Sequence, residues 1–270
     1  MTATVRNPLS FTERLQATGT NFTDKANEKS RPASTRGALG RVLESGVKTD
    51  MEHTYYGFSN AVSAFFEMPT SDARKLLPAH LQPLEVQHTR SILSITAFRF
   101  TESLVGEYDE IVLSVIVPPR VEPGKQLPKA AFFPFMVGTT SDASREHAIE
   151  RWHLPHYMKA IQMDLKPSEN MMAVAVRDGA RPILDMTVTS HEFRPVRDLY
   201  NSFMIDGNDH YKVNIFMEGP HAEHEEERGQ LALHEHEMTA GLTIPDVSDT
   251  AFREQWLRGG LQTFEEMERI

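Results

Sequence analysis

Apolar and polar positions follow a short-period pattern from about Tyr55 onward. Runs that alternate between apolar and polar residues, or stay apolar throughout, dominate this part of the chain, and long runs with helical periodicity are rare. Turn sequences such as Pro118-Pro119 and Asp178-Gly179 separate many of these runs. The expected strands are 61–66, 91–100, 110–117, 131–137, 171–177, 183–190, 211–217 and 231–238.

The same pattern predicts three helices. The first covers 71–77 and the second covers about 142–152. The third is expected to begin near 248–249 and to bury Phe252 and Trp256 on one face. Few helices among many strands favour an α+β fold that is mostly β, with a curved or closed antiparallel sheet and helices packed outside it.

The first 50 residues differ in composition from the rest. Residues 1–50 hold 8 Lys and Arg against 5 Asp and Glu, and they contain few large apolar side chains. Such a segment is typical of a flexible leader, and its basic character also suits docking on an acidic neighbouring subunit. We therefore predict an N-terminal arm at 1–50, flexible or docked on a subunit, and a single domain at 51–270.

Composition argues against several classes of protein. The 270 residues include 28 Lys and Arg against 38 Asp and Glu, a formal net charge of −10, which is unsuited to binding a nucleic acid. The chain has no cysteine, so disulfides and thiolate ligands are excluded. No apolar run approaches the roughly 20 residues of a membrane span, and the start lacks the apolar segment of a secretory signal. We expect no membrane association and a cytoplasmic location.

Two segments carry residues suited to acid–base chemistry. Gly106 to Glu110 forms a turn and an acidic residue at the start of an apolar strand, where desolvation would raise the pKa of the carboxyl. Residues 145–159 gather three histidines, two glutamates, a tyrosine and a lysine. The alternatives are a solvated hairpin turn for the first segment and a polar helix end with surface histidines for the second.

Histidines also cluster between residues 221 and 236. His234 and His236 share one face of the expected strand, a spacing that suits two metal ligands, while His221 and His224 would suit one helical turn. No third ligand has a clear position, and acidic loops rich in histidine are usually solvated. No metal site is therefore expected.

Three short motifs follow one another in the first half of the expected domain. They are Leu76-Leu77-Pro78 with Leu81, Gly106-x-Tyr108-x-Glu110, and Glu150 with Pro155. In this order they resemble the Leu-Leu-Pro…Leu, Gly-x-Tyr-x-Glu and Glu-x-x-x-x-Pro-Lys-Lys elements of the acetoacetate decarboxylase family, over about residues 55–166. The resemblance implies a barrel-like cone of antiparallel sheet with flanking helices, and an active-site position for Glu110.

The third motif departs from the family's pattern. The family has a lysine that forms a Schiff base, next to a lysine that lowers its pKa, where this chain has His156 and Tyr157. An imidazole cannot form the protonated imine, so the resemblance implies a retained cavity with different chemistry. Ser59 falls near the family's active-site arginine, so the ligand either lacks a carboxylate there or uses another cation. The candidate cations are Arg99, Arg151 and Arg194.

We predict an enzyme of this type, a lyase or isomerase that acts on a small or polyketide-like carbonyl compound by non-covalent acid–base chemistry. Dehydration, isomerisation, aldol-type reactions and cyclisation all fit the residues present. Catalysis is assigned to Glu110, His156 and Tyr157. The expected substrate-binding residues are Tyr108, Trp152, His153, Glu150, Lys159 and Ser59.

Two alternatives stay open. The first is a Schiff-base decarboxylase or aldolase that uses Lys159, which requires a helical or irregular backbone to turn this side chain into the site. The second is a non-catalytic ligand-binding protein on the same fold. No cofactor is expected. The expected partners are the carbonyl compound and, because oligomers are common in the family that the chain resembles, further copies of the chain in a homo-oligomer.

Overall fold

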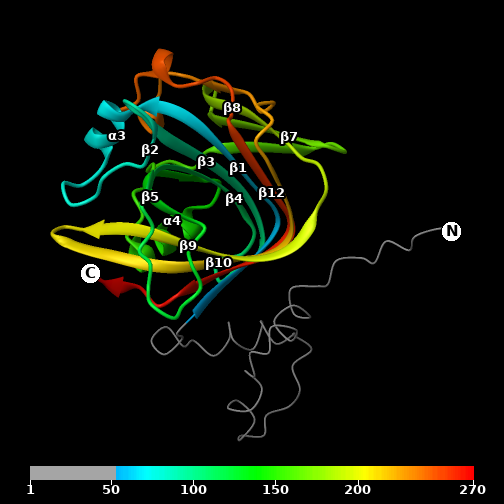
Figure 1. The fold of residues 1–270 in the computed structure, drawn as a ribbon. Helices are drawn as coiled ribbons and strands as arrows, with labels where there is room; N and C mark the ends of the chain where they lie inside the picture. Colours follow the sequence, from blue (N-terminus) through cyan, green and yellow to red (C-terminus); the bar gives the residue numbers. More distant parts are fainter. Residues whose placement is uncertain (1–52) are drawn as a thin grey trace, which may run out of the picture. The chain divides into compact units, whose positions relative to one another are not determined.

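The computed structural model describes residues 53–270, so the arm predicted at 1–50 lies outside the described residues. Seven strands of the described chain close into a barrel (Figure 1). They are β1 (His53–Pro69), β3 (Arg90–Glu102), β4 (Tyr108–Val117), β5 (Ala130–Thr139), β9 (Arg194–Asp206), β10 (Asp209–His224) and β12 (Arg253–Glu265). The short strands β2 (Glu85–Gln87) and β13 (Glu268–Arg269) pair with β3 and β10.

The strand order explains how the barrel closes. Neighbours follow the order β1-β12-β10-β9-β5-β4-β3, and β3 pairs back with β1. The pairs are antiparallel except for β5 and β9, which run parallel over a short register from Ala130 to Phe132. Side chains alternate along each strand, so one set of positions faces the interior of the barrel and the other set faces outward.

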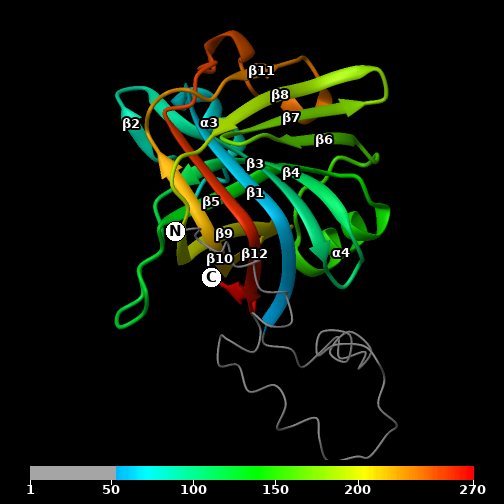
Figure 2. The same cartoon turned by 90° about the vertical axis from the view of Figure 1, so that its right-hand side faces the viewer.

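A second, four-stranded antiparallel sheet lies beside β1 and β12 of the barrel (Figure 2). Its order is β11 (Leu231–Leu233), β8 (Arg181–Thr189), β7 (Met171–Asp178) and β6 (Gln162–Pro167). Alternate residues of β7, such as Val174 and Val176, are buried with outward-facing barrel residues such as Leu93 and Leu113. Burying each such side chain stabilises the fold by roughly 1.5–3 kcal/mol. The main core therefore lies outside the barrel wall, between the two sheets.

Two α-helices, α3 (Thr70–Leu76) and α4 (Asp142–Trp152), are present in the described chain. The Ser141 side chain caps α4 by accepting a hydrogen bond from the backbone N–H of Ser144. The helix ends at His153 in the left-handed region, with a φ of 51°. No helix among residues 53–270 is long and apolar enough to cross a membrane.

The predicted fold class is confirmed, because the structure is mostly β with a closed curved sheet, and the first two expected helices are present. The third expected helix is wrong. This segment belongs to β12, which pairs with β1 on one side and with β10 on the other and so completes the barrel. The strand expected at 231–238 ends at Leu233, and His236 instead caps the 3₁₀ turn η1 (Glu237–Thr239).

Candidate functional site

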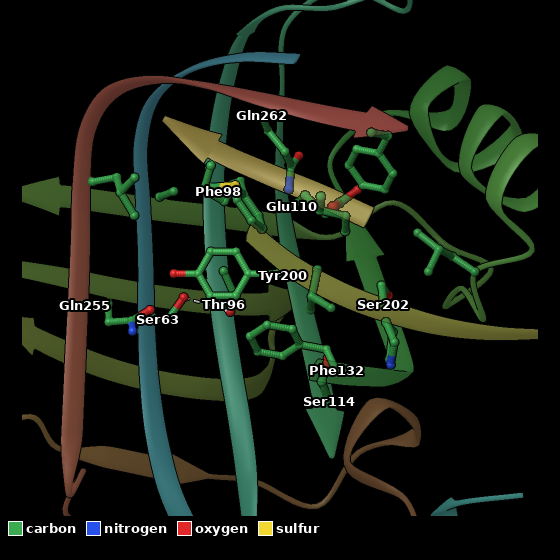
Figure 3. A pocket seen from close by; sticks show the side chains of 18 of the residues that line it. Ser63, Thr96, Phe98, Glu110, Ser114, Phe132, Tyr200, Ser202, Gln255 and Gln262 are labelled. Carbon is green, nitrogen blue, oxygen red and sulfur yellow. Dashed lines mark hydrogen bonds between the residues drawn. The ribbon is translucent and has the colours of Figure 1, made fainter. Parts of the chain in front are cut away.

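A cavity lies inside the barrel and has a volume of about 850 Å³, including its solvent-open part (Figure 3). All seven barrel strands contribute inward-facing residues, and Leu154 adds one from the segment after α4. The polar lining residues are Ser63, Thr96, Glu110, Ser114, Tyr200, Ser202, Gln255 and Gln262. The apolar ones are Ala61, Phe98, Val112, Phe132, Pro134, Leu154, Met204, Ile215, Met217, Leu257 and Phe264.

Glu110 provides the one carboxyl among these lining residues of the described chain. It lies on β4 opposite Phe98 of β3, and it is 8% exposed. No hydrogen bond or ion pair joins its carboxyl to another group within residues 53–270. Burial raises the pKa of Glu110 from its ordinary value of 4.5 to about 8. Near neutral pH, the carboxyl is therefore close to the midpoint of its titration.

Aromatic side chains enclose the Glu110 end of the barrel. The indole N–H of Trp152 donates a hydrogen bond of 2.8 Å to the Tyr56 hydroxyl, which lies 2.9 Å from Nε2 of His147. The Phe264 ring packs against both Tyr56 and Trp152, with centroids 5.4 and 4.6 Å apart. The negative charge of Glu110 raises the pKa of Tyr56 after the larger effect of burial, so these groups are close enough to interact. This aromatic wall accounts for the desolvation of Glu110.

Hydroxyl and amide groups gather at a different part of the cavity (Figure 3). Ser63 and Thr96 face each other across β1 and β3 with their hydroxyls 2.9 Å apart, and Gln255 is the partner of Ser63 on β12. The amide of Gln255 donates a 2.7 Å hydrogen bond to Glu223. Burial raises the pKa of Tyr200 well above its ordinary range, so its hydroxyl keeps its proton and remains a hydrogen-bond donor.

His156 lies beside β5 rather than among the lining residues. Its parallel bridge with Val137 puts both side chains on one face, and Val137 pairs with the cavity-lining Val112. His156 therefore shares the sheet face that carries Glu110. Its two ring nitrogens are buried and have no hydrogen-bond partner within the described residues. Burial, reinforced by the charge of Arg145, lowers the pKa of His156 to about 4, so the ring is neutral.

Tyr157 and Lys159 lie on a different side of the wall. The Tyr157 hydroxyl donates a 2.7 Å hydrogen bond to Asp178 at the end of β7, within the core between the two sheets. The ammonium of Lys159 is 3.9 Å from Asp178 and 5.6 Å from the centre of the Tyr157 ring, and its side chain is 59% exposed. Both residues are absent from the cavity lining, and Tyr157 and Asp178 raise the pKa of Lys159.

The other predicted site residues fall into two groups. Tyr108 and Trp152 are buried in the aromatic surroundings of Glu110, although neither lines the cavity. Ser59, Glu150 and His153 are elsewhere. Ser59 is 3.5 Å from the carbonyl oxygen of Arg99, Glu150 is exposed on α4, and His153 stacks on Tyr211.

The candidate cations are also away from the cavity lining. Arg99 makes two 2.9 Å hydrogen bonds to Asp109, and Arg194 is exposed and paired with Glu192. The guanidinium of Arg151 lies 5.1 Å from the ring centre of Trp152. Among residues 53–270, no three His, Asp or Glu side chains are grouped as ligands for a metal ion.

Apart from Glu110, the lining residues were missed from the sequence, and they come from both halves of the chain, with Ser63, Thr96 and Phe98 among those of the first half. Tyr200, Ser202 and Met204 are alternate residues of β9, and Gln255 and Gln262 come from β12. The alternation of inward-facing and outward-facing residues along β9 could have indicated a strand of the cavity wall. Gln255 and Gln262 could not be assigned to the cavity from the sequence, because β12 was expected to be a helix.

A closed seven-stranded barrel with a four-stranded sheet beside it is the fold of acetoacetate decarboxylase-like proteins, and this chain has that fold. An acetoacetate decarboxylase from Legionella pneumophila superimposes with a TM-score of 0.55 at 14% identity, over 86% of this chain and 98% of that one. An acetoacetate decarboxylase-like enzyme from Sphingomonas wittichii gives 0.56 at 13% identity, over 82% and 94% of the two chains.

The enduracididine biosynthesis enzyme MppR in complex with pyruvate is a third structural neighbour. Its TM-score is 0.55 at 11% identity, and the match covers 89% of this chain and 98% of that one. Similarity at such identities concerns the fold. No protein-family model and no curated protein sequence matches the chain.

Proposed function

We propose that this protein is an enzyme that moves protons on a carbonyl compound bound in the barrel, without forming an imine. One observation carries the proposal: the single carboxyl of the cavity lining is buried, has no partner within the described residues, and has a pKa raised to about 8. A group whose pKa is close to the working pH both accepts and releases a proton efficiently. Glu110 therefore has the properties of a general acid–base.

The proposed step balances without a further reactant. Ionised Glu110 removes a proton from the carbon next to the carbonyl, and the bonding electrons move into an enolate. The same carboxyl then returns the proton to carbon or oxygen. Hydrogen-bond donors stabilise the enolate oxygen, and the amide of Gln262 is one candidate, because Gln262 pairs with Tyr56 at the Glu110 end of the barrel. Neutral His156 is the second candidate for proton transfer, since its ring nitrogens have no partner within the described chain.

Two features of the site support proton transfer over Schiff-base chemistry. The cavity-lining residues of the described chain include no lysine, and Lys159 is exposed and paired with Asp178. A Schiff base needs a neutral amine, whereas the surroundings of Lys159 favour its charged form. The fold itself accommodates small carbonyl ligands, since MppR was solved with pyruvate.

Deuterium exchange tests the proposal without knowledge of the natural substrate. The probe is 4-phenylbutan-2-one in D₂O, and NMR follows the loss of the protons next to its carbonyl. We expect the protein to catalyse this exchange, with a rate that rises with pH as Glu110 ionises around pH 8. Glu110→Gln should lower the rate by about 10²–10⁴-fold.

Glu146→Gln is the matched control, because Glu146 is an exposed glutamate of α4. Its exchange rate should equal that of the unaltered protein. Equal rates for Glu110→Gln and the unaltered protein would remove Glu110 from the mechanism. A ketone that binds but does not exchange would instead indicate a non-catalytic binding protein.

A further inference from the structure

The charge of the cavity restricts the ligands that it can hold. Its lining in the described chain contains no Lys, Arg or His, and Glu110 becomes negative when it ionises. A carboxylate transferred into such a place would lose its hydration without gaining a counter-charge. It would also lie near a group of like charge, which adds a further penalty.

The cations that pair with Glu223, the hydrogen-bond partner of Gln255, do not change this balance. Lys129 donates hydrogen bonds of 2.9 Å to Asp198 and 2.7 Å to Glu223, and the second carboxylate also accepts from Gln255. Two carboxylates therefore face one ammonium. Arg253 lies 3.7 Å from Glu223, but it also pairs with Glu225, so the whole cluster keeps an excess of negative charge.

Two groups of polar lining residues lie apart in the cavity, and the remaining polar residues, Tyr200, Ser114 and Ser202, line other parts of its wall. Glu110 and Gln262 lie at one part, and the Ser63–Thr96 pair with Gln255 lies at the other (Figure 3). Thr96 pairs with Val112, which is two positions from Glu110 on the neighbouring strand, so Thr96 lies about 7–8 Å from Glu110. Gln255 lies two strands beyond Thr96, about 10 Å further. The side chains between these parts include Phe98 and Leu257.

We infer that the cavity takes an uncharged, elongated carbonyl compound with a second hydroxyl or carbonyl group at its far end, and that it rejects keto acids of the same size. The carbonyl lies near Glu110 and Gln262, the apolar body lies along Phe98 and Leu257, and the far polar group bonds to Ser63, Thr96 or Gln255. This inference deepens the proposed function and relies on it for the position of the carbonyl.

Binding of three related probes to the full-length chain tests the inference. The probes are 4-(4-hydroxyphenyl)butan-2-one, 4-phenylbutan-2-one and 2-oxo-4-phenylbutanoate, and calorimetry measures each dissociation constant. We expect the first ketone to bind most tightly, and the keto acid to bind at least about tenfold more weakly than 4-phenylbutan-2-one. A keto acid that binds as tightly as the ketone would overturn the inference.

Two variants sharpen the result. Gln255→Ala should weaken the binding of 4-(4-hydroxyphenyl)butan-2-one by about 3–10-fold, and it should leave the dissociation constant of 4-phenylbutan-2-one unchanged. Leu154 lines the cavity at a half-buried position, so a variant with a longer side chain there is expected to fold. Leu154→Arg adds a cation to the lining and should tighten the binding of the keto acid. Leu154→Met adds no charge and should leave the binding of the keto acid unchanged. Equal effects of Gln255→Ala on both ketones would contradict the far polar contact.

The binding order is independent of turnover, so the two proposals fail separately. Ketone binding in the expected order with no deuterium exchange would refute the proposed function and keep the ligand class. Exchange that depends on Glu110, together with preferred binding of the keto acid, would refute the ligand class and keep the proposed function.

Discussion

Glu110 and Glu254 are both buried carboxyls of barrel strands, but their surroundings differ completely. Glu254 of β12 is 0% exposed and pairs with Ala64 of β1, whose side chain alternates with the cavity-lining Ser63. It therefore faces out of the barrel. Its two oxygens accept hydrogen bonds from the backbone N–H and the hydroxyl of Thr189 and from the backbone N–H groups of Arg228 and Gly229. Glu110 faces inward and has no such donors within the described residues.

This difference separates a structural role from a functional one. A buried carboxylate that accepts several hydrogen bonds fixes the segments that donate them, here the end of β8 and the loop before β11. A buried carboxyl without partners destabilises the folded state. Its hydrogen-bonding capacity remains available to a ligand, and its shifted pKa suits proton transfer. Four predictions test this comparison.

The largest effect is expected for Glu254→Ala. Removing the carboxylate leaves the N–H groups of Thr189, Arg228 and Gly229 without their acceptor, so the free energy of unfolding should fall by about 3–5 kcal/mol. Urea denaturation measures the change. Glu254→Gln keeps the shape of the side chain and one acceptor oxygen, so its free energy of unfolding should fall by less than that of Glu254→Ala. A loss below about 1 kcal/mol for the alanine variant would show that these hydrogen bonds do not stabilise the fold.

Glu110→Gln should have the opposite effect on stability at high pH. The folded pKa of Glu110 is above its ordinary value, so its contribution to stability is fully present below about pH 4.5 and is lost as the pH rises through about 8. The glutamine variant lacks this loss. Between pH 4.5 and pH 9, its unfolding free energy should therefore gain roughly 2–4 kcal/mol relative to the unaltered protein.

Denaturation series at both pH values provide the measurement, and Glu146→Gln serves as the control for an exposed glutamate. A constant difference between Glu110→Gln and the unaltered protein over this range would mean that Glu110 titrates normally. In that case, the contrast between the two buried glutamates would disappear.

The sequence predicted one half of this comparison and missed the other. Glu110 was expected in the site because Gly106-x-Tyr108-x-Glu110 resembles a motif of the acetoacetate decarboxylase family, and the glycine turn before an apolar strand was compatible with a desolvated carboxyl; both signals are local. Glu254 lies in the segment expected to be a helix, where Phe252 and Trp256 have helical spacing. Its extended conformation depends on pairing with β1 and β10, which are distant in sequence.

Two glycines lie within the same strand. Gly259 and Gly260 stand where the register of β12 with β10 is irregular. A Cβ at Gly260 would lie 2.0 Å from the Phe58 ring, so this close packing requires glycine. The cavity could not be predicted for the same reason, since its lining combines strands from both ends of the described chain.

His156→Leu extends the comparison to a buried base, with a smaller effect. The lowered pKa of about 4 means that His156 is neutral in the folded state but protonated in the unfolded state at acidic pH. Its contribution to stability is therefore present above about pH 6.5 and lost as the pH falls toward 4. From pH 8 to pH 4.5, the leucine variant should gain about 1–2 kcal/mol of unfolding free energy relative to the unaltered protein. No relative gain would indicate a solvated imidazole.

Lys159→Met should have the smallest effect, because this lysine shares neither the burial of Glu110 nor the hydrogen-bonded enclosure of Glu254. Its side chain is 59% exposed, and exposed ion pairs such as the one with Asp178 contribute little to stability. The deuterium exchange rate of 4-phenylbutan-2-one should stay within about twofold of the unaltered rate, because the ammonium of Lys159 lies outside the cavity lining and is exposed beside Asp178. Treatment with borohydride and a keto acid, followed by mass spectrometry, should leave Lys159 unmodified. A covalent adduct on Lys159 that is lost together with the exchange activity in Lys159→Met would establish the Schiff-base alternative and reverse the assignment of Glu110.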